Sequence, residues 1–495
     1  MRVFRQSTSQ VLDLSDSLLI ATGGEARIYA VPDDPLLVAK IYHKPSRERT
    51  GKLLVMLAQP PQDPSSNQKH NSIAWPCDVL RSAQFRNRIL GFLMPRVTGM
   101  RRIIDYFNPK TRRQECPLFN YFYLVRTARN LVTAVRALHE RGYVIGDVNE
   151  SNILVSDRAL VTLVDTDSFQ VPDPDKGQVY RCRVGKPEFT PPELQGRSFA
   201  QMDRQPEHDL FGMGVVLFQL LMEGTHPFAG TFTSPGDPPP YEKRIASGHF
   251  PHGSRPRVPY RPSPAAPAFA WLHPSIQDLF VRCFQEGHEN PALRPDTQSW
   301  QGALETLEKS LATCRSNDQH LFSNHLDGCP WCQRAKQLGG RDPFPSISAV
   351  KQGEHLRPAP RSGRRSGARG TATRVPIPRG IPHPSRPFPT GSSYRRGARS
   401  TNPLPKPKFV WPHPPNWSAW MGLLISLVTA YYLWQLPRPA AGSLYMFGIL
   451  GLVAGVVGEV KASSWEMSGR GKWVARVTIG IASLDTAVSV WFLYR

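Results

Sequence analysis

Two aspartates and an asparagine in residues 141–169 constrain this chain more than any other feature. Asp147 is followed five residues later by Asn152, and Asp165 comes directly after a short apolar run. Mg²⁺ takes carboxylate and amide oxygens as ligands, and a carboxylate can accept the proton of an attacking hydroxyl. Each of these residues alone is typical of a loop turn. Their spacing as a set favours a site for phosphoryl transfer.

A glycine turn and a lysine come earlier in the chain, in an order that fits the same chemistry. Residues 17–31 predict two strands joined by a turn at Gly23 and Gly24, and Lys40 lies in the middle of a third predicted strand. Glycines let a backbone approach phosphates closely, and a lysine supplies a compact positive charge. A plain hairpin with a surface lysine gives the same local pattern. The downstream oxygen-bearing residues favour the nucleotide site.

Three further segments complete this part of the chain. Residues 91–97 predict a strand entering a linker, where backbone groups from Met94 onward would pair with adenine. Residues 119–142 predict a helix, because their apolar side chains recur at helical spacing. A helix is also predicted over 46–58, where Glu48 is the acid available to hold the lysine, although a solvated surface position suits it better.

Residues 15–313 resemble a eukaryotic-like Ser/Thr protein kinase domain, a two-lobed α+β fold. They are most similar to a bacterial, membrane-anchored subtype that carries a C-terminal CPWC zinc element. The resemblance implies ATP and Mg²⁺ as cofactors, a protein substrate, Asp147 as the catalytic residue, and Asn152 and Asp165 as Mg²⁺ ligands. It implies that nucleotide is bound by Gly23, Gly24, Ile28, Lys40, Met94, Asn152 and Asp165.

The chain departs from the family pattern at several catalytic positions. Gly23 is the one kept of three usual loop glycines, and Ile145 and Gly146 stand where the family has His and Arg before its catalytic Asp. Asn149 replaces a lysine that would place charge on the transferring phosphoryl group. We expect an active but slow kinase. The alternative is a pseudokinase that binds nucleotide and acts as a membrane-associated scaffold.

A cysteine and histidine cluster follows in residues 314–333. Cys329 and Cys332 form a C-x-x-C pair, and Cys314 lies upstream. Structural Zn²⁺ takes four nitrogen or sulfur ligands, and the family resemblance indicates His320 as the fourth, with His325 as its rival. A disulfide or free thiols are the other interpretations, and a reducing compartment disfavours the disulfide.

Residues 334–415 are rich in Pro, Arg, Ser and Gly, and we expect them to be a disordered basic linker. The stretch 334–410 holds seventeen Lys/Arg against two acids, in a chain of 495 residues with net charge +22. Such a segment can bind anionic lipid or nucleic acid. The apolar segments that follow favour lipid, which makes nucleic acid an unlikely partner.

Three apolar segments, 417–436, 441–458 and 473–494, predict transmembrane helices. Asp485 within the third would be costly in lipid and would face other helices. The basic linker places residues 1–333 on the cytoplasmic side of a multi-pass cell-membrane protein. No signal peptide is predicted at the N-terminus, and the sequence leaves the oligomeric state open.

Overall fold

The computed structural model describes residues 1–85 and 88–357. The chain divides into two compact units, Met1–Gly370 and Thr371–Arg495, and the described residues all belong to the first. The three predicted spans and most of the predicted linker lie outside the described residues. Among the residues that are described, none of the helices combines the length and the apolar character that crossing a membrane requires.

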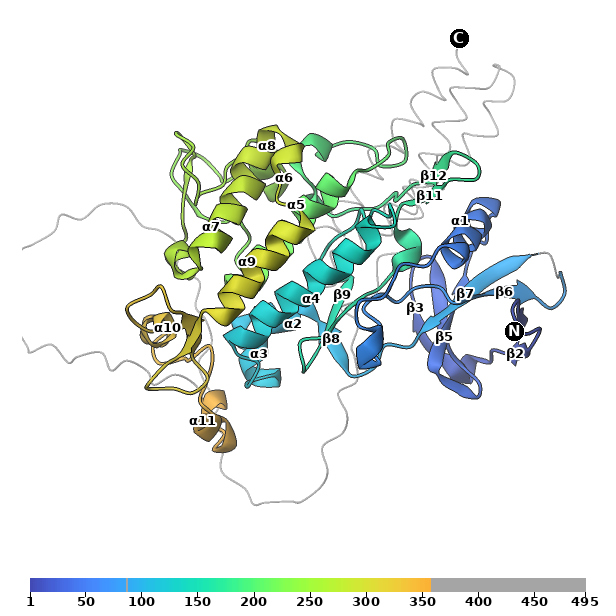
Figure 1. Ribbon diagram of the computed structural model, residues 1–495, viewed down its shortest axis with the longest axis horizontal. Helices are drawn as coiled ribbons and strands as arrows, with labels where there is room; N and C mark the ends of the chain where they lie inside the picture. The colour runs from blue at the N-terminus through green and yellow to red at the C-terminus, as the bar shows by residue number, and fades with distance from the viewer. Residues whose placement is uncertain (86–87, 358–495) are drawn as a thin grey trace, which may run out of the picture. The chain divides into compact units, whose positions relative to one another are not determined.

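An antiparallel sheet of seven strands builds the N-terminal lobe (Figure 1), in the order β2-β1-β6-β7-β5-β4-β3. Helix α1 (Arg47–Ala58) packs on it and buries Leu53 and Met56. The sheet begins before the predicted domain start at residue 15, because Val3 and Leu12 are buried in it. Its strands are β1 (Arg2–Arg5), β2 (Val11–Asp13), β3 (Leu19–Thr22), β4 (Ala26–Val31), β5 (Asp34–Tyr42), β6 (Asp78–Ser82) and β7 (Ile89–Pro95).

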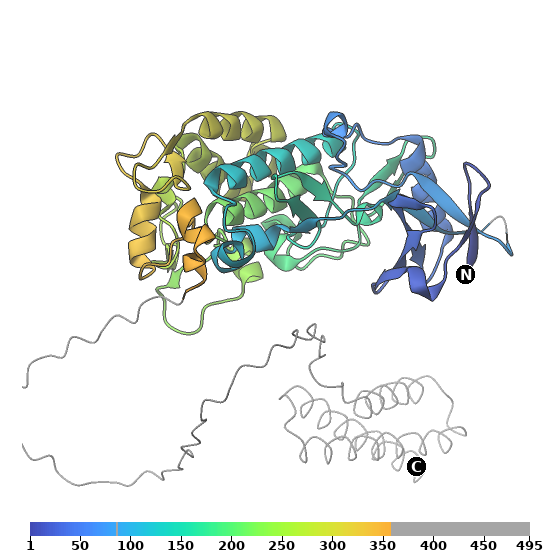
Figure 2. The same cartoon turned by 90° about the horizontal axis from the view of Figure 1, so that it is seen from below.

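Helices dominate the second lobe, where α4 (Tyr121–His139) and α9 (Thr297–Lys309) lie side by side in both views (Figures 1 and 2). The predicted apolar stripe of α4 is buried, and the next long helix, α5 (Pro206–Leu221), is apolar nearly all round because it lies within the core. The shorter helices are α2 (Ile103–Phe107), α3 (Pro109–Glu115), α6 (Tyr241–Ala246), α7 (Pro274–Val281) and α8 (Gly287–Glu289).

Short strands carry the loops between the lobes. A three-stranded sheet has the order β10-β9-β8, and two further antiparallel pairs join β11 with β12 and β13 with β14. These strands are β8 (Met100–Arg102), β9 (Ile153–Ser156), β10 (Val161–Leu163), β11 (Val171–Asp173), β12 (Gln178–Tyr180), β13 (Thr231–Phe232) and β14 (Tyr260–Arg261). The loop between α4 and β9, and the segment after β10, therefore meet at the junction of the lobes.

The predicted disorder is wrong for residues 334–357. This part contains the end of α10 (Pro330–Gln337) and all of α11 (Ile347–Lys351). Phe344 is 1% exposed and its ring lies 4.8 Å from that of Trp331. The Arg334 guanidinium pairs at 2.7 Å with Glu223, whose side chain is also buried. A few anchoring side chains order a segment whose average composition is that of a linker.

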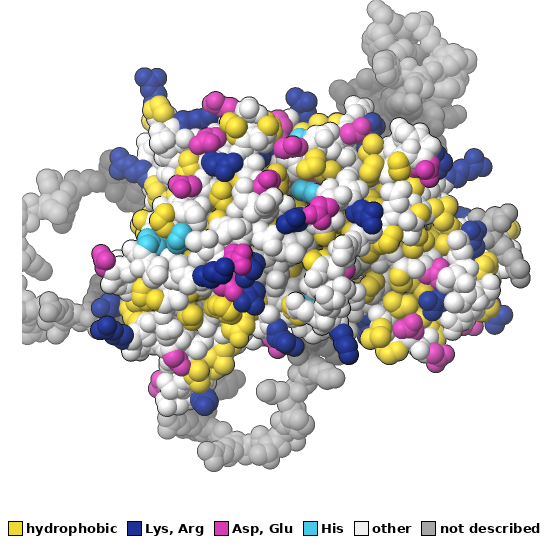
Figure 3. Space-filling view, in the orientation of Figure 1, with side chains coloured by type: hydrophobic (Ala, Val, Ile, Leu, Met, Phe, Trp, Pro, Cys, Tyr) yellow, Lys and Arg dark blue, Asp and Glu magenta, His cyan; other side chains and the backbone are white. Residues whose placement is uncertain are grey.

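Positive and negative charges nearly balance in residues 1–357. Residues 1–357 hold 43 Lys/Arg against 36 Asp/Glu, so most of the net charge of +22 lies beyond residue 357. On the face in Figure 3, acidic and basic side chains lie interspersed.

Candidate active site

Lys40 lies on β5 and holds two carboxylates. Its Nζ is 2.7 Å from Asp165 Oδ1 and 2.5 Å from Asp167 Oδ1. The Tyr42 hydroxyl donates to Asp167 Oδ2 at 2.9 Å. Burial disfavours the charged ammonium, but the carboxylates outweigh it, so the pKa of Lys40 lies above its ordinary value. The predicted lysine and the predicted aspartate therefore meet, together with an aspartate that the sequence analysis did not select.

Asp165 has a left-handed backbone conformation. Its φ of 59° and ψ of 36° lie in a region that few residues other than glycine adopt, and aspartate does so more readily than most. The preceding residue, Val164, donates its backbone N–H to the Asn152 carbonyl at 3.0 Å. This bond holds the Asp147–Asn152 loop beside Asp165.

The side chains of Asp147 and Asn152 are linked as their spacing predicts. Asn152 Nδ2 donates to Asp147 Oδ2 at 3.2 Å and to the Asp147 carbonyl at 3.1 Å. The other carboxylate oxygen of Asp147 is buried and accepts no hydrogen bond from any described residue. Burial raises the pKa of Asp147 above its ordinary value, against the opposing effect of its hydrogen-bond donors. A carboxylate in this condition is suited to accept a proton.

Asp209, at the start of α5, fixes the backbone before Asp147. Its carboxylate accepts the N–H groups of Ile145 and Gly146, both at 2.7 Å, and lies 3.0 Å from His139 Nε2. Asp209 is 1% exposed. The residues around Asp209 do not predict this cap, because it joins segments 64 residues apart in the chain.

Arg204 ties the same loop to the segment that follows Asp165. Its guanidinium donates to the Gly146 carbonyl and, at 2.5 Å, to the Val184 carbonyl. Gly146 has φ +75°, and a Cβ there would lie 2.8 Å from Cys182 Sγ. The family's arginine at this position is thus replaced by a glycine, and Arg204 links the two loops without a phosphate.

The other predicted nucleotide residues lie on the strands around Lys40. Gly23 and Gly24 form the turn between β3 and β4, and Ile28 on β4 stands opposite Lys40 in the β4–β5 register. Met94 lies near the end of β7, which pairs with β5. Strand register therefore places Ile28 beside Lys40, and nucleotide binding by the four residues stays a prediction.

Helix α1 does not supply an acid to Lys40. Glu48 pairs with Arg183 at 2.8 Å on the surface. The helix instead turns Lys52 inward, where it is 8% exposed and lines a cavity of 160 Å³ with Asp165 and Asp167. Burial lowers the pKa of Lys52 to about 8. The sequence signals were the absence of an inward acid on α1 and the extra acid in D-T-D at 165–167.

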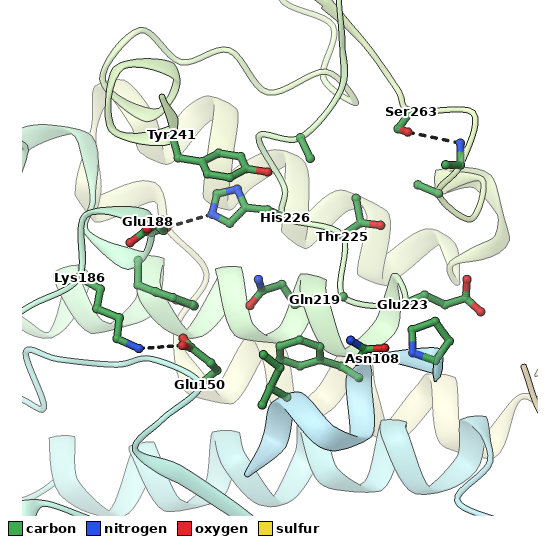
Figure 4. A pocket seen from close by; sticks show the side chains of 18 residues that line it. Asn108, Glu150, Lys186, Glu188, Gln219, Glu223, Thr225, His226, Tyr241 and Ser263 are labelled. Atoms are coloured by element: carbon green, nitrogen blue, oxygen red, sulfur yellow. Dashed lines mark hydrogen bonds and ion pairs between the residues drawn. The ribbon is translucent and has the colours of Figure 1, made fainter. Parts of the chain in front are cut away.

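A larger cavity of 830 Å³ lies beside the catalytic loop (Figure 4). Glu150 and Lys186 pair at its wall, at 2.7 Å. Three acceptor atoms on lining residues are buried without a donor among the described residues: Glu150 Oε2, Gln219 Oε1 and Glu223 Oε1.

The four predicted zinc ligands come together after α9. β15 (Leu311–Thr313), β16 (Leu321–Ser323) and the start of α10 bring one atom each from Cys314, His320, Cys329 and Cys332 within 4.8 Å of one another. The sulfurs of Cys314 and Cys332 are 3.7 Å apart. A disulfide needs about 2 Å, whereas zinc at about 2.3 Å from each thiolate in a tetrahedron sets the sulfurs about 3.8 Å apart. The donors therefore fit Zn²⁺.

The orientation of His320 separates it from its rival His325. His320 Nδ1 lies 3.5 Å from the sulfurs of both Cys329 and Cys332. Its Nε2 lies 2.8 Å from a carboxylate oxygen of Asp342, an arrangement that directs the other nitrogen to a metal. His325 Nδ1 contacts the Ser323 hydroxyl instead.

Comparison with known families agrees with this geometry. Residues 98–248 match the family model described as the protein kinase domain. Residues 98–248 therefore belong to a protein kinase domain. The prediction of a protein kinase domain is confirmed. The matched range contains α4, α5, the catalytic loop and Asp165, whereas Lys40 comes before it and helices α7 to α9 come after it.

The relatives of the kinase domain include "Protein kinase YegI" from two strains of Escherichia coli. One is 33% identical over 316 residues, which cover 63% of this chain and 48% of that protein. The other is 32% identical over 329 residues, covering 66% and 49%. "Probable serine/threonine-protein kinase irlC" of Dictyostelium discoideum is 27% identical over 110 residues, 22% of this chain and 7% of that protein. The chain spans about half the length of its YegI relatives.

Proposed function

We propose that this protein is a Ser/Thr protein kinase that transfers the γ-phosphoryl group of ATP to a protein hydroxyl. The observation that carries the proposal is the ion pair of Lys40 with Asp165, held beside the loop of Asp147 and Asn152. Mg²⁺ supplies charge neutralisation on the phosphates. Lys40 binds phosphate oxygens, Asp147 orients the substrate hydroxyl and takes its proton, and Asn152 and Asp165 offer the oxygens that hold the metal.

We propose that the protein substrate binds in the 830 Å³ cavity. Three acidic residues, Glu150, Glu188 and Glu223, line this cavity, and their negative charge favours substrates with an Arg or Lys side chain near the phosphorylated residue. A peptide library phosphorylated by the full chain tests this. Enrichment of basic residues at one fixed offset is the expected result, and a library without any basic preference would contradict it.

The Cys314, His320, Cys329 and Cys332 cluster is proposed to hold a structural Zn²⁺. Four protein ligands leave no open coordination position, so the ion has no catalytic part. The support is the fit of the donor distances and the bond from His320 to Asp342. One zinc per chain, measured on protein purified without a His tag, is the expected result.

Membrane tethering is also proposed, on sequence grounds alone. Residues 417–436 are uncharged and long enough to span a bilayer, and the basic stretch before them suits anionic lipid on the cytoplasmic side. Fractionation of cells expressing the full chain tests this: recovery with the membranes after a high-salt wash is expected.

A nucleotide-binding pseudokinase is the second candidate. The observation that favours it is Asn149, which is 1% exposed and places no charge on a phosphate. ATP hydrolysis and phosphoryl transfer by the purified chain decide between the two. Transfer that Asp147→Asn abolishes supports the kinase, and nucleotide binding without transfer supports the pseudokinase.

A further inference from the structure

The catalytic loop lacks the lysine that the family uses to neutralise the transferring phosphoryl group. Asn149 stands in its place, and both ends of its amide are engaged by the loop itself. Its Nδ2 donates to the Asp147 carbonyl at 3.0 Å, and its Oδ1 accepts the Ser151 N–H at 2.9 Å. This side chain shapes the loop and brings no charge.

A lysine from another segment lies against that loop. Lys186 Nζ is 2.7 Å from Glu150 Oε1 and 2.8 Å from the Ser151 hydroxyl, so it contacts two neighbours of Asn149. The ammonium therefore lies against the catalytic loop, beside the residues that follow Asp147 and Asn149.

The position of Lys186 is fixed at one end and open at the other. Its carbonyl accepts the Phe189 N–H at 3.0 Å and the Thr190 hydroxyl at 2.8 Å. Its side chain is 39% exposed and lines the cavity beside the catalytic loop, as Figure 4 shows. The backbone of Lys186 is held by hydrogen bonds, and its ammonium is accessible. These two properties suit a residue that binds a negatively charged group between the catalytic loop and the cavity.

We propose that Lys186 is a catalytic residue that contacts the transferring phosphoryl group in place of the lysine missing at position 149. This rests on the proposed kinase function. In the step, the bond between the γ-phosphorus and the bridging oxygen of ADP breaks, and ADP keeps its electron pair. A bond forms from the substrate oxygen to phosphorus, and the hydroxyl proton passes to Asp147. Lys186 stabilises the negative charge on the oxygens of the moving group.

Steady-state kinetics of the full chain with Mg-ATP and a protein substrate test the proposal. Lys186→Met is expected to lower kcat about 100-fold while changing the KM for ATP less than threefold, because Lys40 still binds the nucleotide. The exposed Lys243→Met, on α6, is the matched control and keeps wild-type kcat. Wild-type kcat in Lys186→Met would overturn the proposal.

Relocating the lysine separates a catalytic from a structural role. The exchange variant Asn149→Lys with Lys186→Thr returns the ammonium to the family position and is expected to recover at least tenfold of the lost kcat. An exchange variant that melts like wild type without recovering kcat overturns the proposal. If it melts lower, Lys186→Ala in propylammonium decides: a rise in kcat supports the proposal, and no rise overturns it. A wild-type chain that transfers no phosphoryl group refutes the kinase function itself, which is a separate result.

Discussion

Lys40 Nζ lies 2.5 Å from Asp167 Oδ1. In this buried pair Asp167 holds the lysine, as an acid on α1 was expected to do. The Asp167 side chain is 5% exposed and also accepts the Tyr42 hydroxyl. Both ends of the D-T-D segment at 165–167 thus bind one ammonium. Lys40 is positioned by the turn that also offers the proposed metal ligand.

Asp167→Asn is expected to reduce kcat/KM for ATP roughly 10- to 100-fold, because a charged hydrogen bond contributes about 1.5–3 kcal/mol. Lys40 keeps Asp165 as a partner, so the loss is smaller than for Lys40→Met. The comparison is steady-state kinetics beside Asp175→Asn, an exposed acid on the β11–β12 turn. Equal kcat/KM in wild type and Asp167→Asn would show that Asp167 does not position the lysine.

Kinase activity is expected to be independent of phosphorylation in the segment after Asp165. Arg204 already joins Gly146 to Val184 without a phosphate, so a phosphate on that segment is not needed to hold the two loops together. Treating the purified chain with a phosphatase, removing the phosphatase and then measuring transfer checks this. Activity within twofold of untreated protein is expected, and a loss of tenfold or more would refute it.

The general scheme of the site could be predicted from sequence because its parts have fixed spacing. Asp147, Asn152 and Asp165 belong to one loop-and-strand unit, and the apolar stripe of α4 predicts the helix that carries the loop. The order of the predicted strands also indicates that Lys40 belongs to this site. The family resemblance indicated His320 as the fourth zinc ligand and left His325 as its rival, and the contacts in the structure separate the two.

The remaining features depend on contacts between distant segments, which a local pattern does not contain. The site contacts of three residues form only when the lobes and loops pack together: Asp167, Lys52 and Arg204. Residues 334–357 have linker-like composition, yet Arg334 and Phe344 are buried against residues far earlier in the chain. The average composition of a segment does not reveal one or two side chains that anchor it to the rest of the fold.

Asp342→Asn is expected to weaken zinc binding about 10- to 100-fold, because it removes the carboxylate that orients His320. Competition with a chromophoric zinc chelator measures the affinity. His325→Gln is the control and is expected to keep wild-type affinity, since His325 contacts Ser323 rather than the cluster. A larger loss in His325→Gln than in Asp342→Asn would reverse the ligand assignment.

Lys52→Met is expected to stabilise the fold at pH 7 by up to about 3 kcal/mol, since each pKa unit corresponds to about 1.4 kcal/mol. Burial lowers the pKa of Lys52 to about 8, and the carboxylates of Asp167, Asp165 and Glu48 and the Cys182 thiol partly oppose this. Between pH 8 and the ordinary value of 10.5, the unfolded chain binds a proton that the folded chain does not. The free energy of unfolding of the wild type therefore rises toward that of the variant as the pH rises through that window.

Urea unfolding of both proteins at pH 7, 8, 9 and 10 measures this difference. It should shrink steadily as the pH rises, and exposed Lys44→Met should show no such trend. A difference that stays constant with pH would mean that Lys52 keeps its ordinary titration in the folded protein.

The most direct measurement is phosphoryl transfer from Mg-ATP by the full-length wild-type chain and by Asp147→Asn, followed by mass-spectrometric mapping of the products. The account predicts phosphoserine or phosphothreonine with wild type, and at least 100-fold less with Asp147→Asn, because the proton acceptor is lost. Equal incorporation by the two proteins, or none by wild type in the presence of bound nucleotide, would contradict it.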